Sequence, residues 1–174
     1  LDLFVVVLGG ATALLPIYAR DILMAGPVGL GLLRSAPAAG ALITSIVLSR
    51  HPIERHIGRN MFVVTAIYGL TTICFALSTS LPFSLLTLAV LGAADAMSVV
   101  IRFSLVQIET PDAMRGRVSA INYLFVGSSN TLGEFESGMV AGWLGAVTSV
   151  LIGGVGSLLV AGTWMVLFPD LRRI

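Results

Sequence analysis

Two acidic residues stand close together in a long apolar stretch of the sequence, where Glu134 and Glu136 interrupt what would otherwise suit a membrane helix. A third acid, Asp95, and two basic residues, Arg34 and Arg102, interrupt other apolar stretches. An ionised side chain at the centre of a membrane helix costs roughly 2.5–3.5 kcal/mol on insertion scales. Such a residue is kept where it carries protons, binds charge on a substrate or pairs with a neighbouring helix. These five residues are therefore our first candidates for a substrate or proton pathway.

The spacing of Asp95, Ser98 and Arg102 puts them on one side of a helix, at i, i+3 and i+7. Asp95 and Arg102 are then about 10 Å apart along the axis, too far for a direct bond. They are expected either to bind charge on a substrate or to join an interhelical charge network. Arg34 lies about two turns inside its helix and could extend its guanidinium outward to water or bind substrate; the first of these is favoured.

Asn130 and Glu134 form an i, i+4 pair on one helix face, whereas Glu136 points about 200° away from Glu134 around the axis. Two faces of this helix are therefore polar, which predicts that it lies deep in a bundle. One glutamate is expected to carry protons and the other to hold an Asn or Arg of a neighbouring helix. The spacing leaves open which is which.

Composition identifies the environment of these side chains. The chain has 174 residues, of which 56% are hydrophobic and 11% are charged, against about 25% charged in soluble domains. This indicates an integral membrane protein. No basic run with interleaved aromatic residues is present, so we expect no nucleic-acid partner.

Six apolar runs are long enough to cross a bilayer as helices, and the linkers between them are too short for a soluble domain. The runs are Leu3–Ala19, Val28–Leu48, Met61–Ser78, Pro82–Ile108, Val118–Gly142 and Ala146–Phe168. The sequence thus predicts an all-α protein, an integral membrane bundle of six helices.

Arginines predict its orientation. If all six runs span, seven arginines share one side and only Arg20 lies in the opposite linkers. Basic residues gather on the cytoplasmic side of membrane proteins. The C-terminal tail, the basic linkers and the first residues are therefore expected in the cytoplasm. The seven are Arg50, Arg55, Arg59, Arg115, Arg117, Arg172 and Arg173.

The distribution of ionisable residues divides the predicted helices into two groups. The third and sixth runs hold no ionisable residue besides Tyr or Cys and are expected to face lipid, whereas the second, fourth and fifth, with the first, should face a polar interior. Tyr68 and Tyr123 are expected to serve packing. Pairs of small residues four apart predict close helix contacts; these pairs are Ala36 with Gly40, Ala89 with Ala93, and Gly138 with Gly142.

The linker before the fifth run resembles a helix start, with Thr110 as cap, Pro111 in the first turn and Asp112 at the positive end of the helix dipole. Arg115 and Arg117 follow at the expected cytoplasmic surface. They could contact lipid headgroups, or form a latch that pairs with acidic residues in one conformational state and releases in another.

The stretch TPDAMRGRVSAINYLFVGSSNTLGEFESG, residues 110–138, resembles carriers of the major facilitator superfamily. It is most similar to the branch of enterobactin-exporter-like and macrolide-efflux-like proteins, the transmembrane secretion effectors. Pro111, Arg115, Gly116 and Arg117 carry the resemblance, together with GEFESG at 133–138. A second loop signature of the superfamily is matched by Gly58 and Arg59, while the acidic and basic residues of ERHIGR at 54–59 sit one residue early.

The resemblance implies that residues 1–174 form the C-terminal six-helix half of a twelve-helix carrier. The half would consist of two inverted repeats, 1–80 and 82–168, and a cytoplasmic tail, 169–174, as such carriers do. The implied partners are a missing N-terminal half, the bilayer, a small-molecule substrate and protons. The implied activity is secondary active, proton-coupled efflux, as an antiporter in the plasma (inner) membrane, of a drug-like or siderophore-like amphipathic molecule.

The residues present argue against two kinds of membrane protease. A serine protease in the membrane needs a buried His beside its Ser, and His51 and His56 both fall in a cytoplasmic linker. An aspartyl protease needs two membrane aspartates, and only Asp95 qualifies. No nucleotide motif is present, and we expect no enzyme activity, cofactor or metal. A membrane scaffold without transport stays open.

Overall fold

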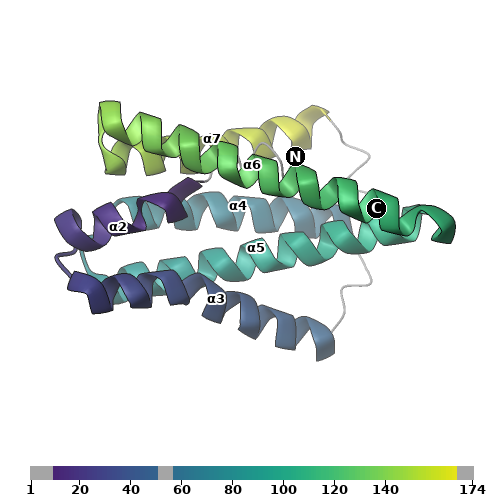
Figure 1. Cartoon of the computed structure of the whole chain (residues 1–174), viewed down its shortest axis with the longest axis horizontal. Coiled ribbons are helices and arrows are strands. Elements are labelled where there is room, and N and C mark those ends of the chain that lie inside the picture. The colour runs from purple at the N-terminus through teal and green to yellow at the C-terminus, as the bar shows by residue number, and fades with distance from the viewer. Residues whose placement is uncertain (1–9, 51–56, 168–174) are drawn as a thin grey trace.

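The computed structural model describes residues 10–50 and 57–167, and within these ranges the chain is helical with no strand. Among the described residues, five long helices that alternate in direction along the chain and a more irregular N-terminal segment make one elongated bundle (Figure 1). The five long helices are α3 (Gly26–Arg50), α4 (Ile57–Ala76), α5 (Leu81–Glu109), α6 (Arg115–Leu144) and α7 (Ala146–Leu167). The predicted all-α fold is confirmed.

The first described segment is not a regular α-helix. It consists of a 3₁₀ turn, η1 (Gly10–Leu14), a short α2 (Leu15–Ile17) and a π turn, η2 (Tyr18–Ile22). The prediction of one run over Leu3–Ala19 is only partly testable, because residues 1–9 lie outside the described ranges. Tyr18 anchors this segment: it is fully buried and its ring lies 4.6 Å from that of Phe75.

A prediction follows from the same anchor. The Tyr18 hydroxyl donates a buried hydrogen bond to the Ala76 carbonyl, 3.2 Å away. Tyr18→Phe removes the donor, and we expect the free energy of unfolding to fall by about 1 kcal/mol. Tyr123→Phe is the matched control, because Tyr123 is largely exposed. Unfolding in detergent, followed by circular dichroism, would contradict the role of the bond if both variants matched the parent protein.

Four described helices are long and apolar enough to cross a membrane: Gly26–Arg50, Gly58–Ala76, Leu81–Ser104 and Ala146–Leu167. They correspond to the second, third, fourth and sixth predicted runs. The fifth run lies inside α6, which is 30 residues long but is not among the four. Its serines, asparagines and acids lower its hydropathy, so its length, and not its composition, matches a span.

Small residues bring α3 and α5 together. A β-carbon added at Gly40 would collide with the Ala89 carbonyl oxygen, and one added at Gly92 would collide with the backbone of Pro37. The contacts predicted for the Ala36–Gly40 and Ala89–Ala93 pairs are thus confirmed. The contact predicted for Gly138 and Gly142 is wrong, because a β-carbon at either position would meet open space.

The α4 helix lies between α5 and α7 and packs against both. Its contact with α7 is again made by glycines, since a β-carbon on Gly69 or Gly154 would press on the other helix. Beyond Arg59 near its start, the exposed side chains of α4 follow one stripe that continues one residue past the helix, at i, i+4, i+7, i+11 and i+14: Val63, Ile67, Leu70, Cys74 and Leu77. These side chains are uncharged and suit acyl chains, which agrees with the prediction that this helix faces lipid, while the opposite face of α4 packs inside the bundle.

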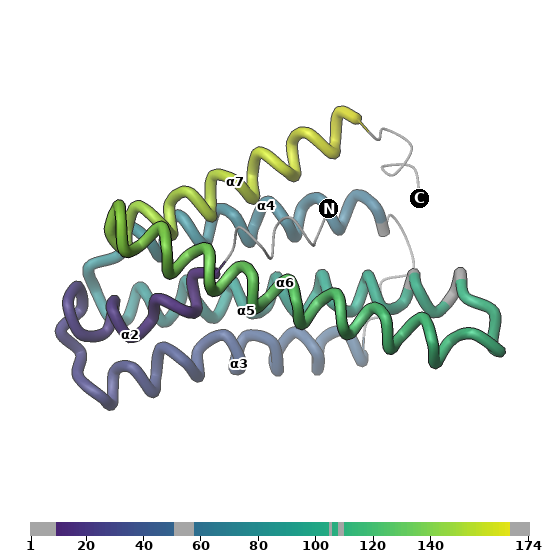
Figure 2. Tube along the Cα trace, turned by 45° about the horizontal axis from the view of Figure 1, so that its top comes forward, coloured from purple at the N-terminus to yellow at the C-terminus, as the bar shows by residue number. Residues whose placement is uncertain are grey.

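The α6 helix lies at the edge of the bundle, and the prediction that it lies deep inside is wrong. Its buried residues are small and share one narrow face: Ser129, Gly133 and Ser137. This face packs on η1, where Gly10 approaches Gly133, and on α7, where the Ser149 hydroxyl donates to the Ser137 carbonyl at 2.9 Å. From their shared turn at Gly145, α6 and α7 diverge along the bundle (Figure 2).

Candidate functional site

A small cavity of about 140 Å³, lined by both polar and apolar groups, lies where η1, α3, α4, α5 and α6 face one another. Five elements contribute to its wall, so no single segment of the sequence contains it. Its lining residues are Gly10, Thr12, Pro37, Tyr68, Leu91, Gly92, Asp95, Asn130 and Glu134. We refer to it as the acidic pocket.

The α5 helix places Asp95 in the acidic pocket. Leu91 and Gly92, one turn earlier, are buried against the neighbouring helices, and the chain therefore presents the Asp95 carboxylate beside this packed turn. The Asp95 side chain itself is exposed, because none of the described elements covers this face. Ser98, one turn later on the same side, is buried.

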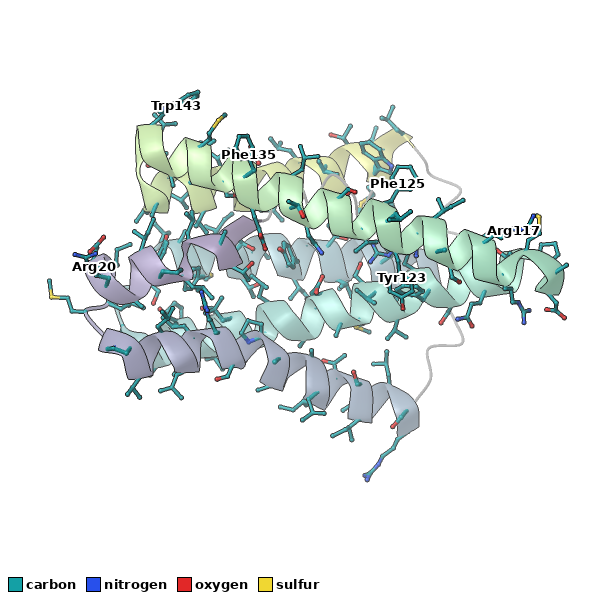
Figure 3. The ribbon with its side chains drawn as sticks, viewed as in Figure 1. Arg20, Arg117, Tyr123, Phe125, Phe135 and Trp143 are labelled. Atoms are coloured by element: carbon teal, nitrogen blue, oxygen red, sulfur yellow. The ribbon has the colours of Figure 1, made fainter. Side chains whose placement is uncertain are left out.

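The α6 helix places Asn130 and Glu134 in the same pocket, as the i, i+4 spacing suggests. The neighbouring face, with Ser129 and Gly133, is the one that packs on η1 and α7. Asn130 and Glu134 each follow one of these packed residues directly. Since successive residues of a helix are about 100° apart around its axis, both side chains point toward α5 and the pocket. Figure 3 shows the orientation of the helix: Phe135 and Trp143 project away from α5, whereas the Tyr123 ring lies 5.4 Å from that of Phe103 on α5.

Glu136 does not line the acidic pocket. It is half-buried on the other flank of the packed face, and its Oε2 atom is buried without a hydrogen bond from any described residue. The side-chain nitrogen of Asn122, about four turns earlier on α6, is likewise buried without a hydrogen-bond partner among the described residues. The two glutamates therefore have different surroundings, although they are two residues apart.

The predicted basic residues lie outside the pocket wall. Arg34 is exposed on α3, one turn before Pro37, which agrees with a guanidinium that extends outward. Arg102 is half-buried on α5, two turns from Asp95. Among the described residues that line the acidic pocket, none is basic.

The sequence did not mark six of the lining residues as part of a pathway: Gly10, Thr12, Pro37, Tyr68, Leu91 and Gly92. Tyr68 was expected only to pack, but it comes from the inner face of α4 and supplies a hydroxyl-bearing ring to the wall. Pro37 lies inside α3, where it removes one helical hydrogen bond and bends the helix. The proline in the middle of a predicted span could have indicated a cavity, whereas no local sequence pattern distinguished Thr12 or Tyr68 from packing residues.

The predicted cytoplasmic motif lies at the far end of the bundle. Thr110 ends α5 and donates to the Val106 carbonyl, so it does not cap the next helix as expected. Asp112 starts a short 3₁₀ turn, η3 (Asp112–Met114), and its carboxylate lies 2.9 Å from the Arg115 guanidinium. The Arg115 Nε also donates to the Thr110 carbonyl at 3.3 Å.

The other motif residues make fewer contacts. Gly116 has open space where a side chain would begin, and Arg117 is exposed. In the second motif Gly58 is buried and Arg59 is exposed, while the rest of that loop, including His51 and His56, lies outside the described residues. Of the described motif residues, Asp112 and Arg115 form an ion pair of the kind that the latch hypothesis requires. This pair lies within one turn and does not connect different helices.

Two carboxylates, an amide and hydroxyl groups can accept and donate hydrogen bonds, take up protons and attract cations. Across residues 10–50 and 57–167, no cluster of three or more His, Cys, Asp or Glu could hold a metal ion. The acidic pocket is thus suited to protons or to hydrogen-bonding small molecules.

A bundle of apolar helices with ionisable groups gathered on one inner wall defines an integral membrane protein of the transporter class. The sequence comparison agrees, because residues 2–173 match the family described as transmembrane secretion effector. The chain belongs to this family, a branch of the major facilitator superfamily, as its motifs indicated. The family is one of transporters and not of enzymes.

Two curated relatives are similar to the chain. The enterobactin exporter EntS of Citrobacter koseri is 30% identical over 148 residues, which are 83% of this chain and 35% of the relative. YvqJ of Bacillus subtilis, an uncharacterised transporter of the same superfamily, is 25% identical over 163 residues, 92% of this chain and 38% of the relative. The chain thus spans little more than a third of the length of these proteins. No solved structure matches it.

Proposed function

We propose that the chain forms part of a secondary active exporter that moves a small amphipathic molecule against proton entry. The observation that carries the proposal is the acidic pocket, which brings together Asp95 of α5 and Glu134 of α6, two carboxylates that lie 39 residues apart in the chain. The relative described as an enterobactin exporter supports efflux as the direction and a siderophore-like or drug-like molecule as the cargo.

Coupling follows from the cost of enclosing charge. An unprotonated carboxylate in the middle of a closed membrane protein costs about 2.5–3.5 kcal/mol on insertion scales, and protonation removes this cost. Closure over the acidic pocket would therefore favour protonated Asp95 and Glu134, and opening to water would release the protons. This is a two-state element whose equilibrium a proton gradient can bias.

The pocket needs a second wall. Asp95, Asn130 and Glu134 are exposed because the described elements leave this side of the bundle uncovered. We propose that an N-terminal six-helix half closes it, with this chain as the C-terminal half and residues 1–80 and 82–168 as its inverted repeats. Transport by alternating access would then take place between the two halves.

Orientation is part of the proposal. Arg117 and Arg20 lie at opposite ends of the bundle (Figure 3), and the ends of α3 and α5 and the starts of α4 and α6 share the Arg117 end. We propose that this basic end faces the cytoplasm and that the protein is inserted in the plasma (inner) membrane, with both ends of the chain inside.

A scaffold without transport has less support, since a scaffold gains nothing from acids on an uncovered wall.

Reconstitution of the complete carrier in liposomes would test the proposal. We expect dyes, macrolides or siderophores to move when a pH gradient is imposed, and the flux to stop when a protonophore collapses the gradient. The 174-residue chain alone is the matched control and should give no flux, since half of the wall is absent. Flux that is indifferent to the protonophore would contradict proton coupling, and absence of flux with all three compound classes would favour the scaffold.

A further inference from the structure

A second, larger cavity lies at the end of the bundle that carries Arg20, away from the acidic pocket. It measures about 540 Å³, within the range of small-molecule sites. Its lining comes from the first described segment and from the start of α3: Pro16, Ala19, Arg20, Met24, Gly26, Pro27 and Leu30. Apart from Arg20, every lining side chain is apolar. We refer to it as the outer groove, and Figure 3 shows Arg20 at that end.

The outer groove is held open by its backbone. Two hydrogen bonds close the turn, from Leu23 N to the Tyr18 carbonyl and from Ala25 N to the Ala19 carbonyl, each at 2.8 Å. Met24 between them has a φ of 47°, a left-handed conformation that is uncommon for a residue other than glycine. Because Tyr18 is buried and hydrogen-bonded to α4, the rear of the turn cannot collapse into the groove.

The outer groove has one charged lining residue, the basic Arg20. The Arg20 side chain is 88% exposed, so its guanidinium is available to a ligand. Its nearest acid is Asp21, with an Nε to Oδ1 distance of 3.7 Å, and Asp21 is not part of the groove wall. An exposed contact of this length is worth little and is readily exchanged for a better partner.

We propose that the outer groove binds a small amphipathic molecule that carries one anionic group. Its apolar body would lie on Pro27 and Leu30, and its carboxylate or sulfate would accept hydrogen bonds from Arg20, which holds such groups with two parallel N–H bonds. The charge is opposite in sign to that of the acidic pocket, so the two cavities select different ligands. The inference uses the proposed function only to name the occupant as cargo and not as bilayer lipid.

Equilibrium binding tests the inference without any gradient. The probe is dansyl-labelled undecanoic acid, whose emission shifts in an apolar site, with its methyl ester as the uncharged analogue. The protein is reconstituted in nanodiscs of zwitterionic lipid. We expect Arg20→Gln to weaken binding of the acid about tenfold and to leave binding of the ester unchanged. Arg20→Lys should restore most of the affinity, and Leu30→Gln should weaken both probes.

Arg117→Gln is the matched control, since Arg117 is an exposed arginine at the opposite end of the bundle. Equal affinity of acid and ester for the unaltered protein would overturn the proposal, and so would equal losses from Arg20→Gln and Arg117→Gln. Displacement of the acid by nanodiscs of anionic phospholipid would show a lipid site and would also overturn it. A negative result in this binding experiment would not contradict proton-coupled transport. A negative result in the flux experiment would not contradict ligand binding in the outer groove.

Discussion

The Glu134→Gln carrier is expected to lose proton-driven accumulation of cargo by roughly 100-fold, while Glu136→Gln retains it. The magnitude follows from a cost of about 2.5–3.5 kcal/mol for enclosing one carboxylate, since every 1.4 kcal/mol is tenfold. Glutamine resembles the protonated acid in shape and has no proton to release. The pocket can then close regardless of pH, and the link between closure and the proton gradient is broken.

The two glutamates have different surroundings in the structure, which makes the pair its own control. Glu134 lines the acidic pocket with Asp95, whereas Glu136 is half-buried on the opposite flank of the packed face. Exchange of cargo for cargo, which needs no gradient, should survive in Glu134→Gln because the cavity is preserved. Wild-type, protonophore-sensitive flux in Glu134→Gln would remove the proposed proton role, as would equal losses in both variants.

The second large effect is expected at the contact between α3 and α5. Gly40→Val should destabilise the bundle by about 3 kcal/mol or more, the upper range for overpacked sites. The reason is that the new β-carbon collides with the backbone carbonyl of Ala89, which no side-chain rotation can relieve. The two helices would have to separate, and α3 would lose the narrow face formed by Gly29, Leu33, Ala36 and Gly40 that holds it to the bundle.

Gly31→Val is the control for this experiment. Gly31 lies on the same helix, and a β-carbon there has open space, so the two variants share any change in helix propensity and differ only in the contact. Thermal unfolding in detergent, with size-exclusion chromatography as a check on assembly, would measure the difference. Equal unfolding temperatures for Gly40→Val and Gly31→Val would show that the helices do not pack at this glycine.

Much of the architecture was predictable from the sequence, because membrane helices follow local rules. Apolar length indicated the spans, arginine asymmetry indicated which ends lie together, and the pairs Ala36 with Gly40 and Ala89 with Ala93 indicated a close contact. The i, i+4 spacing of Asn130 and Glu134 was also sufficient to place them on one face. Each of these properties depends on residues within one helix or one linker.

Tertiary structure decided which face of each helix meets which neighbour. Periodicity shows that Glu134 and Glu136 point in different directions, but only the packing of Gly133 and Ser137 on η1 and α7 turns Glu134 toward Asp95. The same holds for Tyr68, which reaches the acidic pocket because α4 lies between α5 and α7. The rotation of a helix about its own axis is set by the summed contacts with helices distant in sequence, and no local pattern contains that sum.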